Sequence, residues 1–233
     1  MTTAVITGAS SGIGLATARL FLEHRYEVYN LSRRPCPDTR VNSVKIDLSS
    51  PRLAVNLKRS LLSQLDLTPP TEIHLIHNAA KLHSDTALAT TDETLQEVMQ
   101  VNVFAPNTLN RLLIPHMAAG SSIVLVGSTL AEKAVANVFS YVTSKHAVVG
   151  MMRALCQDLA GTEVHVSCIC PGFTDTEMLR SRIPEDNLND VAQMSTFQRL
   201  VQPEEIAQSI FWATQNPVLN GSVIHANLGQ KEQ

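Results

Sequence analysis

These 233 residues contain few aromatic side chains, only a small excess of negative charge and no long apolar run. Aromatic residues make up only 4% of the chain, while 44% of it is hydrophobic, so the core must consist mainly of aliphatic side chains and alanine. This composition favours buried parallel strands and alanine-rich helices over an aromatic-packed β-sandwich. The net charge of −3 provides no basic surface for a nucleic-acid or anionic-membrane partner.

Signals for membrane insertion, secretion and metal binding are also missing. No apolar run reaches the roughly 18 residues that a membrane-spanning helix needs. A predicted strand begins at Ala4, which leaves no room for a signal peptide, so we expect a cytoplasmic protein. The cysteines match no zinc or redox spacing and there is no HExxH motif, so no metal site is expected. Cys168 and Cys170 alternate in an apolar run, which is typical of small buried residues.

Strand and helix patterns alternate along the whole chain, which predicts an α/β fold. We expect one domain over residues 1–233: a Rossmann-type, doubly wound parallel sheet of about seven strands with helices on both faces. The connection after the second strand is too short for a full helix. Residues 171–201 form the one long irregular stretch and are expected to be a lid over the site. The predicted strands are Ala4–Thr7, Val28–Leu31, Val44–Asp47, Ile73–His77, Ile123–Val126, Val164–Ile169 and Val223–Ala226. The predicted helices are Gly12–His24, Arg52–Leu65, Thr91–Met117, Ser140–Ala160 and Glu204–Thr214.

The first strand is followed directly by the glycine-rich segment TGASSGIG, from Thr7 to Gly14. Glycine lets the backbone approach a ligand closely, and the N-terminus of the following helix offers free N–H groups to a pyrophosphate. The spacing GxxxGxG differs from the commoner GxGxxG, and a ligand-free turn would have the same composition. Its place at the first strand–helix junction favours a dinucleotide site. The expected binding residues are Gly8, Ser10, Ser11, Gly12, Ile13 and Gly14.

A second pattern, YVTSK, places Tyr141 and Lys145 four residues apart at the start of a predicted helix. Residues at this spacing share one helix face. A nearby ammonium group favours the phenolate form of a tyrosine, which makes the phenol a usable general acid or base. Ser128 follows the fifth strand, at the sheet edge where doubly wound folds bind ligands, and its hydroxyl would hold a substrate oxygen. Thr129 is the local alternative for that role.

In combination and in order, these motifs resemble the short-chain dehydrogenase/reductase family from Thr3 to about Gly229. The resemblance implies nicotinamide-dependent redox chemistry, with Tyr141, Lys145 and Ser128 in the roles given above. It further implies that Asn102 binds a water linking Lys145 to solvent, and that Asn78 stabilises the central sheet. His77 and Ala80 depart from the family's NNAG segment, and His77 is expected to be packed or hydrogen-bonded. The further positions implied for cofactor contact are Asp47, Leu48, Asn78, Ala79, Tyr141, Lys145, Pro171, Gly172, Thr174 and Thr176.

The end of the second strand carries the residues that select the coenzyme. Nicotinamide enzymes specific for NAD usually place a carboxylate here to bind the ribose 2′-hydroxyl. This chain has LSRR at Leu31–Arg34 instead. Ser32 and Arg33 are therefore predicted to bind a 2′-phosphate, and the cofactor is predicted to be NADP(H). Within the glycine turn, Ser11 stands where many NADP-dependent members of the family have a second basic residue. The alternative interpretation is that Arg33 and Arg34 are ordinary solvated surface charges.

The predicted reaction is NADPH-dependent reduction of a ketone or diketone, with Tyr141 as the general acid. Apolar lid residues favour an uncharged apolar or aromatic carbonyl substrate, and the sequence looks most like the sepiapterin/benzil reductase branch. A 3-oxoacyl-thioester reductase is the alternative, with Arg180, Arg182 and Arg199 meeting an acyl carrier. A catalytically silent NADP-sensing protein is a second alternative. The apolar helices predicted at Thr91–Met117 and Ser140–Ala160 imply a homodimer or homotetramer by resemblance.

Overall fold

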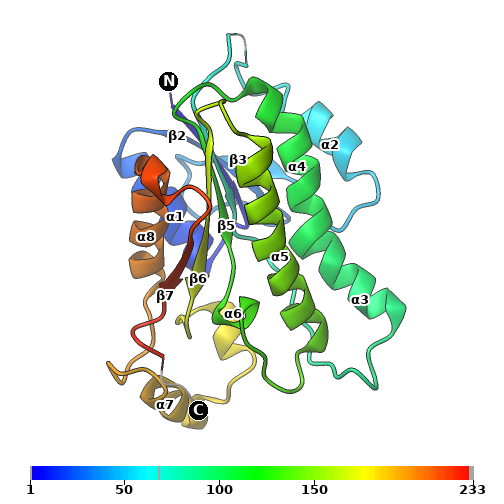
Figure 1. Ribbon diagram of the computed structural model, residues 1–233, viewed down its shortest axis with the longest axis vertical. Coiled ribbons are helices and arrows are strands. Elements are labelled where there is room, and N and C mark those ends of the chain that lie inside the picture. Colours follow the sequence, from blue (N-terminus) through cyan, green and yellow to red (C-terminus); the bar gives the residue numbers. More distant parts are fainter. Residues whose placement is uncertain (1, 68, 231–233) are drawn as a thin grey trace.

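The structure is a computed structural model that describes residues 2–67 and 69–230, and its centre is a sheet of seven parallel strands (Figure 1). The strands are β1 (Thr3–Thr7), β2 (Glu27–Ser32), β3 (Asn42–Lys45), β4 (Ile73–His77), β5 (Ser122–Val126), β6 (His165–Pro171) and β7 (Val223–Ala226). Their order across the sheet is β3-β2-β1-β4-β5-β6-β7. The direction of winding reverses between β1 and β4, where doubly wound sheets form their ligand crevice. The predicted fold class is confirmed.

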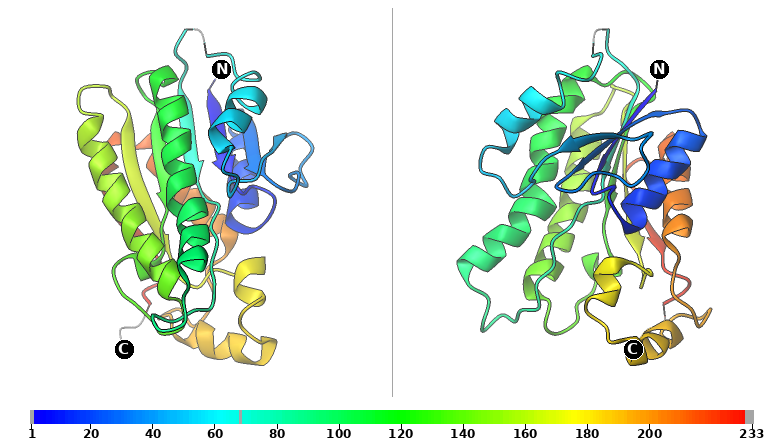
Figure 2. Two further views of the ribbon diagram at one scale, coloured as in Figure 1. Left: turned by 90° about the vertical axis from the view of Figure 1, so that its right-hand side faces the viewer. Right: turned by 180° about the vertical axis from the view of Figure 1, so that it is seen from behind.

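Helices cover both faces of the sheet, as Figures 1 and 2 show. Helices α1 (Gly12–Glu23) and α8 (Pro203–Gln215) pack side by side on one face. On the other face lie α2 (Leu53–Ser60), α4 (Ala105–Leu113) and α5 (Phe139–Asp158). Successive strand residues alternate between the two layers, so Val5 joins the core under α4 and α5 while Ile6 joins the core under α1 and α8. Aliphatic side chains dominate both layers, as the composition indicates.

The helix predicted at Thr91–Met117 is interrupted. It consists of α3 (Asp92–Met99), a π-helical segment (Gln100–Phe104) and α4, followed by a 3₁₀ turn at Ile114–His116. Pro106 explains the interruption, because proline has no N–H to donate to the carbonyl of Asn102 and its ring crowds that carbonyl. The backbone instead makes a wider bond from Ala105 N–H to the carbonyl of Gln100. Single π-helical turns of this kind are frequent at functional sites.

The predicted irregular lid contains two short helices, α6 (Glu177–Arg180) and α7 (Leu188–Gln193), with a 3₁₀ turn at Glu185–Asn187 between them. The lid lies beyond the carboxyl end of the sheet (Figure 2). The prediction of an irregular stretch was wrong, because a helix of four residues such as α6 leaves almost no periodicity in the sequence. The start of α6 is stabilised by one local cap, the hydrogen bond from Leu179 N–H to the Thr176 hydroxyl. The predicted helix Arg52–Leu65 begins at Leu53 and ends at Ser60. As predicted, the connection from β2 to β3 holds no helix. In the described ranges, no helix combines the length and apolarity that a bilayer crossing requires.

Candidate active site

The sequence motifs converge at the carboxyl edge of the sheet, because each follows the end of a parallel strand. The glycine turn follows β1, Asn78 follows β4 and Ser128 stands just beyond β5. Pro171 ends β6 and leads into the lid. In parallel sheets these ends meet at one edge, which is where such folds bind ligands. Residues scattered over about 170 positions of the predicted site therefore belong to one region of the molecule.

The glycine turn has the shape that a pyrophosphate requires. Gly8 and Gly12 have φ angles of +75° and +53°, a region that glycine enters without strain. A Cβ atom on Gly14 would lie 2.3 Å from the carbonyl oxygen of Gly8, so the turn closes only around a bare backbone there. The first helical positions of α1, Gly12 to Gly14, have no intrahelical acceptor for their N–H groups. These residues fit a dinucleotide phosphate.

Asn30 on β2 organises the neighbouring coenzyme-selecting loop. Its buried side-chain oxygen accepts from Ala9 N–H at 2.9 Å, and its amide donates to the Ser32 hydroxyl at 3.0 Å. The Ser32 hydroxyl donates in turn to the carbonyl of Arg34. A phosphate bond from Ser32, as predicted, would therefore have to replace this contact. The guanidinium of Arg34, and not that of Arg33, reaches the glycine turn, where it donates to the Ser11 hydroxyl at 3.3 Å.

Asn78 ties the ends of the two central strands together. Its amide donates to the carbonyls of Thr7 and Gly8 at 3.0 and 3.2 Å, and the Thr7 hydroxyl accepts from the N–H groups of Asn78 and Ala79. These contacts join the end of β1 to the segment that follows β4. Asp47 is exposed beyond β3, where bonds from Ser49 lower the pKa of its carboxyl group. Leu48, its neighbour in the predicted adenine site, is buried.

Tyr141 and Lys145 lie together on the first turns of α5, as their spacing predicts. Tyr141 is 8% exposed and Lys145 is 3% exposed, and the Lys145 ammonium lies 5.3 Å from the centre of the tyrosine ring. The ammonium donates to the carbonyl of Val126 at 2.7 Å, which fixes it under the end of β5. A buried ammonium needs such partners to offset its lost hydration.

Ser128 is the half-buried hydroxyl at the end of β5, whereas its predicted rival Thr129 is buried. The Ser128 oxygen accepts from Leu130 N–H at 3.1 Å, which starts a 3₁₀ turn at Thr129–Ala131. Because that bond uses a lone pair, the hydroxyl hydrogen is left to donate to a substrate oxygen. The geometry therefore favours Ser128 over Thr129 for contact with a substrate.

Asn102 lies in the π-helical segment and is 3% exposed. Its side-chain oxygen accepts from Lys81 N–H at 2.7 Å, and its amide donates to the carbonyl of Lys81 and to the Ser144 hydroxyl, both at 2.9 Å. Ser144 donates to the carbonyl of Tyr141 at 2.7 Å. Asn102 thus reaches the tyrosine helix through Ser144, a contact that the sequence did not suggest.

Asp85 is a further site residue that the sequence analysis missed. Its carboxylate accepts from Ser140 N–H at 3.1 Å, at the first turn of α5, where the N-cap residue Val138 provides no side-chain cap. This bond and contacts with Thr90 counteract burial and lower the pKa of Asp85. A carboxylate from a distant loop therefore caps the helix that carries Tyr141. Nothing in the local spacing around Asp85 signals this role.

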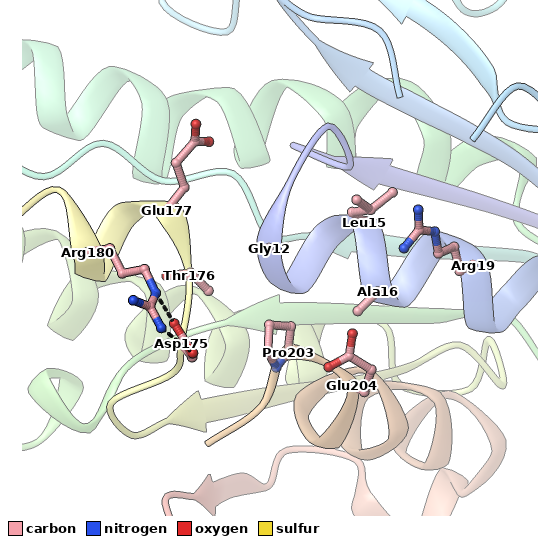
Figure 3. Close-up of a pocket in the computed structure, with 10 residues that line it drawn as sticks. All are labelled: Gly12, Leu15, Ala16, Arg19, Asp175, Thr176, Glu177, Arg180, Pro203 and Glu204. Atoms are coloured by element: carbon pink, nitrogen blue, oxygen red, sulfur yellow. Dashed lines mark hydrogen bonds and ion pairs between the residues drawn. The ribbon is translucent and has the colours of Figure 1, made fainter. Parts of the chain in front are cut away.

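The base of the lid rests against the glycine turn. The backbone of Thr174 pairs with that of Val201, and the Thr174 hydroxyl donates to the carbonyl of Gly172. A Cβ atom on Gly12 would lie 3.1 Å from the Thr176 methyl group. A pocket of about 240 Å³ opens between the first turns of α1, the start of α8 and this part of the lid (Figure 3). The lid residues predicted for cofactor contact therefore adjoin the glycine turn.

The residues predicted to have no role at the site are largely buried. His77 is buried and bonds Asn110 at 2.8 Å, in agreement with its predicted packing role. Cys168 and Cys170 are buried beneath Gly127, where a Cβ atom would meet both sulfurs at 2.8 Å. Across residues 2–67 and 69–230, no three histidine, cysteine or acidic side chains gather as a metal site.

Comparison with protein families agrees with this geometry. The model of the family described as "short chain dehydrogenase" matches residues 2–187. The chain belongs to the short-chain dehydrogenase family. In this dehydrogenase the glycine turn, Tyr141 and Lys145 thus stand in the fold that the sequence motifs indicate.

Individual relatives are distant but cover nearly the whole chain. The dehydrogenase is 26% identical to "Carbonyl reductase family member 4" of Xenopus laevis, over 94% of this chain and 93% of that protein. It is 27% identical to "NADPH-dependent aldehyde reductase 2, chloroplastic" of Arabidopsis thaliana, over 97% and 92%. A solved structure of 4-hydroxyisoleucine dehydrogenase with NADH superposes with a TM-score of 0.87 at 25% identity, covering 98% of each chain. The proteins similar to this chain therefore include one named as NADPH-dependent and one solved in complex with NADH.

Proposed function

We propose that this short-chain dehydrogenase reduces a ketone or diketone with NADPH and that Tyr141 is the general acid. When bound, the coenzyme supplies a hydride to the carbonyl carbon. The observation that carries the proposal is the buried Lys145 ammonium, which lies 5.3 Å from the centre of the Tyr141 ring and donates to the Val126 carbonyl at the end of β5. In this arrangement, Ser128 holds the substrate oxygen and Tyr141 gives it a proton. Lys145 stabilises the resulting phenolate by its charge and binds the ribose hydroxyls.

The preference for NADPH rests on the loop after β2. The two residues directly after β2, Arg33 and Arg34, offer guanidinium groups where NAD enzymes usually have a carboxylate, and the Arg34 group already contacts Ser11 in the glycine turn. Guanidinium groups bind phosphate through charge-assisted hydrogen bonds. The NADPH-dependent Arabidopsis relative supports this choice, whereas the 4-hydroxyisoleucine dehydrogenase structure holds NADH. We therefore propose a preference for NADPH, with Arg34 joining Arg33 at the 2′-phosphate.

The substrate is proposed to be an uncharged apolar or aromatic carbonyl compound, as in the sepiapterin/benzil reductase branch. Exposed apolar side chains support this choice: Met178 and Phe197 in the lid, and Val135 and Phe139 between β5 and the first turn of α5. The acyl-carrier alternative gains less support, because the lid arginines are occupied. Arg180 is paired with Asp175, Arg199 is paired with Glu205, and Arg182 donates to Ser84 and the Leu82 carbonyl. A panel of diketones assayed beside an acetoacetyl thioester distinguishes the two substrate classes.

Substitution of Tyr141 by phenylalanine tests the mechanism, because it removes the phenol and keeps the ring. We expect kcat to fall by about 100-fold or more, the size usual for loss of a general acid, with unchanged NADPH binding. Ser128→Ala should also lower kcat while leaving the coenzyme affinity intact. Near-normal turnover by Tyr141→Phe would overturn the assignment. Tight NADPH binding without turnover of any carbonyl by the wild-type protein would instead favour the silent sensor.

We also propose that the chain forms a homodimer or homotetramer through α4 and α5. Phe104 is exposed at the start of α4, and Gly150 on α5 has no atom within 4 Å of an added Cβ. Gly150→Arg tests this pairing, because the protomer has room for the side chain and an apposed copy does not. Light scattering should show a smaller assembly for the variant. An unchanged mass would place the interface elsewhere.

A further inference from the structure

An ion pair joins the lid to the coenzyme-selecting loop. The Arg34 guanidinium lies 2.9 Å from the Glu177 carboxylate and 3.3 Å from the Ser11 hydroxyl. Arg34 follows β2, Ser11 belongs to the glycine turn, and Glu177 is the first residue of α6. Three segments far apart in the sequence therefore meet at one guanidinium group. Both charged side chains remain more than 60% exposed, so the pair is accessible to solvent and solutes.

The other ion pairs of lid arginines are local by comparison. Arg180 bonds Asp175 and Arg199 bonds Glu205, partners that are five and six residues away. Such pairs hold the lid to itself or to the start of α8. The pair between Arg34 and Glu177 spans 143 positions and connects the lid with the opposite wall of the coenzyme region. In Figure 3, Glu177 points away from the Arg180–Asp175 pair.

The position of this guanidinium matters because it is bounded by the glycine turn and the end of β2. A phosphate on the adenosine ribose of a dinucleotide would be bound between those same two segments. The Glu177 carboxylate is already an anion bonded to Arg34, and it lies within reach of Ser11 as well. The contact with Arg34 lowers the pKa of Glu177, so this carboxylate carries its charge at neutral pH. A second anion at Arg34 would meet both a competitor and a like charge.

We propose that Glu177 is a coenzyme-selectivity residue: its carboxylate competes with the ribose 2′-phosphate for Arg34 and so weakens the discrimination between phosphorylated and unphosphorylated coenzyme. The inference rests on the proposed function in that the site binds a nicotinamide dinucleotide. It concerns a lid residue outside the predicted set of cofactor contacts. Binding of a 2′-phosphate then requires the carboxylate to move off the guanidinium, which also loosens the tie between α6 and the β2 loop. An unphosphorylated ribose makes no such demand.

The experiment measures binding without turnover, using 2′,5′-ADP and 5′-AMP as probes in calorimetry with the full-length protein. These two probes differ only in the 2′-phosphate. Glu177→Gln keeps the side-chain shape and removes the charge. Glu185→Gln is the matched control, since it removes another carboxylate of the lid. The Glu185 carboxylate lies 4.0 Å from the guanidinium of Arg180 and does not pair with Arg34. Glu177→Gln should bind 2′,5′-ADP about fivefold more tightly, the effect of one exposed charge pair.

The same variant should leave 5′-AMP binding unchanged, and Glu185→Gln should match the wild type for both probes. High salt should shrink the gain, because both partners are exposed. Equal affinity of wild type and Glu177→Gln for 2′,5′-ADP, or an equal gain for both probes, overturns the role of Glu177. If the wild type binds both probes alike and only Glu177→Gln prefers 2′,5′-ADP, the inference stands and the NADPH preference of the native protein fails. Failure of all proteins to bind either probe overturns both.

Discussion

The carboxylate of Asp85 accepts a hydrogen bond from the backbone N–H of Ser140, the residue that precedes Tyr141. The backbone of Asp85 also bonds the segment before α5, from Asp85 N–H to the Asn137 carbonyl and from Phe139 N–H to the Asp85 carbonyl. The loop after β4 thereby holds the start of the helix that carries the proposed acid. Because Val138 provides no side-chain cap, the first turn of the helix that carries Tyr141 is held by a residue 56 positions before that tyrosine.

Asp85→Ala should therefore reduce both stability and turnover. Loss of the cap is expected to cost about 1 kcal/mol of unfolding free energy, and a misplaced phenol should lower kcat by about tenfold or more. Urea unfolding and steady-state kinetics measure the two effects. Asp158→Ala at the other end of α5 is the control and should leave both nearly unchanged. Loss of stability with normal kcat would show that Asp85 supports the helix without positioning Tyr141.

Arg33 and Arg34, which directly follow β2, should differ in their effects on coenzyme binding. Arg34 contacts Ser11, and no side-chain hydrogen bond from Arg33 to the glycine turn is present among the described residues. Arg34→Ala should weaken binding of 2′,5′-ADP by about tenfold, as loss of a charge-assisted phosphate contact predicts. Arg33→Ala should weaken it less. The ratio of kcat/KM for NADPH and NADH should fall in the same order; the reverse order would restore the choice of Arg33 made from the sequence.

Much of this site follows from the sequence because its key residues lie in short motifs. The glycine turn and the Tyr141–Lys145 pair are each defined by local spacing, and strand ends fix their common edge. Asn30, Asp85 and Glu177 could not be found in this way, because their partners are 21, 55 and 143 positions distant. Such contacts depend on tertiary packing. Distant pairs carry no periodic signal along the chain.

Two predicted elements were wrong, the continuous helix at Thr91–Met117 and the irregular lid, and only the first error has a cause that can be read from the sequence. Pro106 stands inside the helix predicted at Thr91–Met117, and its missing N–H is a sequence-level reason for the π-helical segment around Asn102. The lid helices were harder to predict from the sequence, because α6 has only four residues and depends on the cap from Thr176. A helix so short leaves almost no periodicity to detect.

Gly14→Ala should disrupt the glycine turn. Its added Cβ would lie 2.3 Å from the Gly8 carbonyl oxygen and 2.5 Å from the Asn78 amide nitrogen, so backbone must move. We expect a cost of about 2 kcal/mol, typical of overpacking, together with weaker binding of NADPH. Glu23→Ala is the control, because it changes an exposed side chain at the other end of α1 and should leave both the stability and the NADPH affinity nearly unchanged. Normal NADPH affinity in Gly14→Ala would contradict the proposed phosphate site.

Buried histidines should make the fold sensitive to mild acid. Burial lowers the pKa of His74 and of His77 to about 4. In the unfolded chain a histidine titrates near 6.5, so the unfolded state binds more protons between pH 4 and 6.5. The free energy of unfolding should therefore be highest above pH 6.5. It should fall as the pH drops toward 4, by on the order of 3 kcal/mol per histidine. The ion-paired carboxylates of Asp38 and Glu205, with pKa values of about 2, lose their contribution only at lower pH.

Urea unfolding at several pH values from 4.5 to 7.5 measures this slope. His77→Asn removes one titrating group and retains an amide that can face Asn110, the hydrogen-bond partner of His77. Its unfolding free energy should depend less steeply on pH than that of the wild type. His146→Asn, at an exposed position of α5, is the control and should keep the wild-type slope. The slope should fall because the variant no longer has a group that binds a proton only in the unfolded chain. Equal slopes for His77→Asn and the wild type would show that the acid sensitivity has another origin.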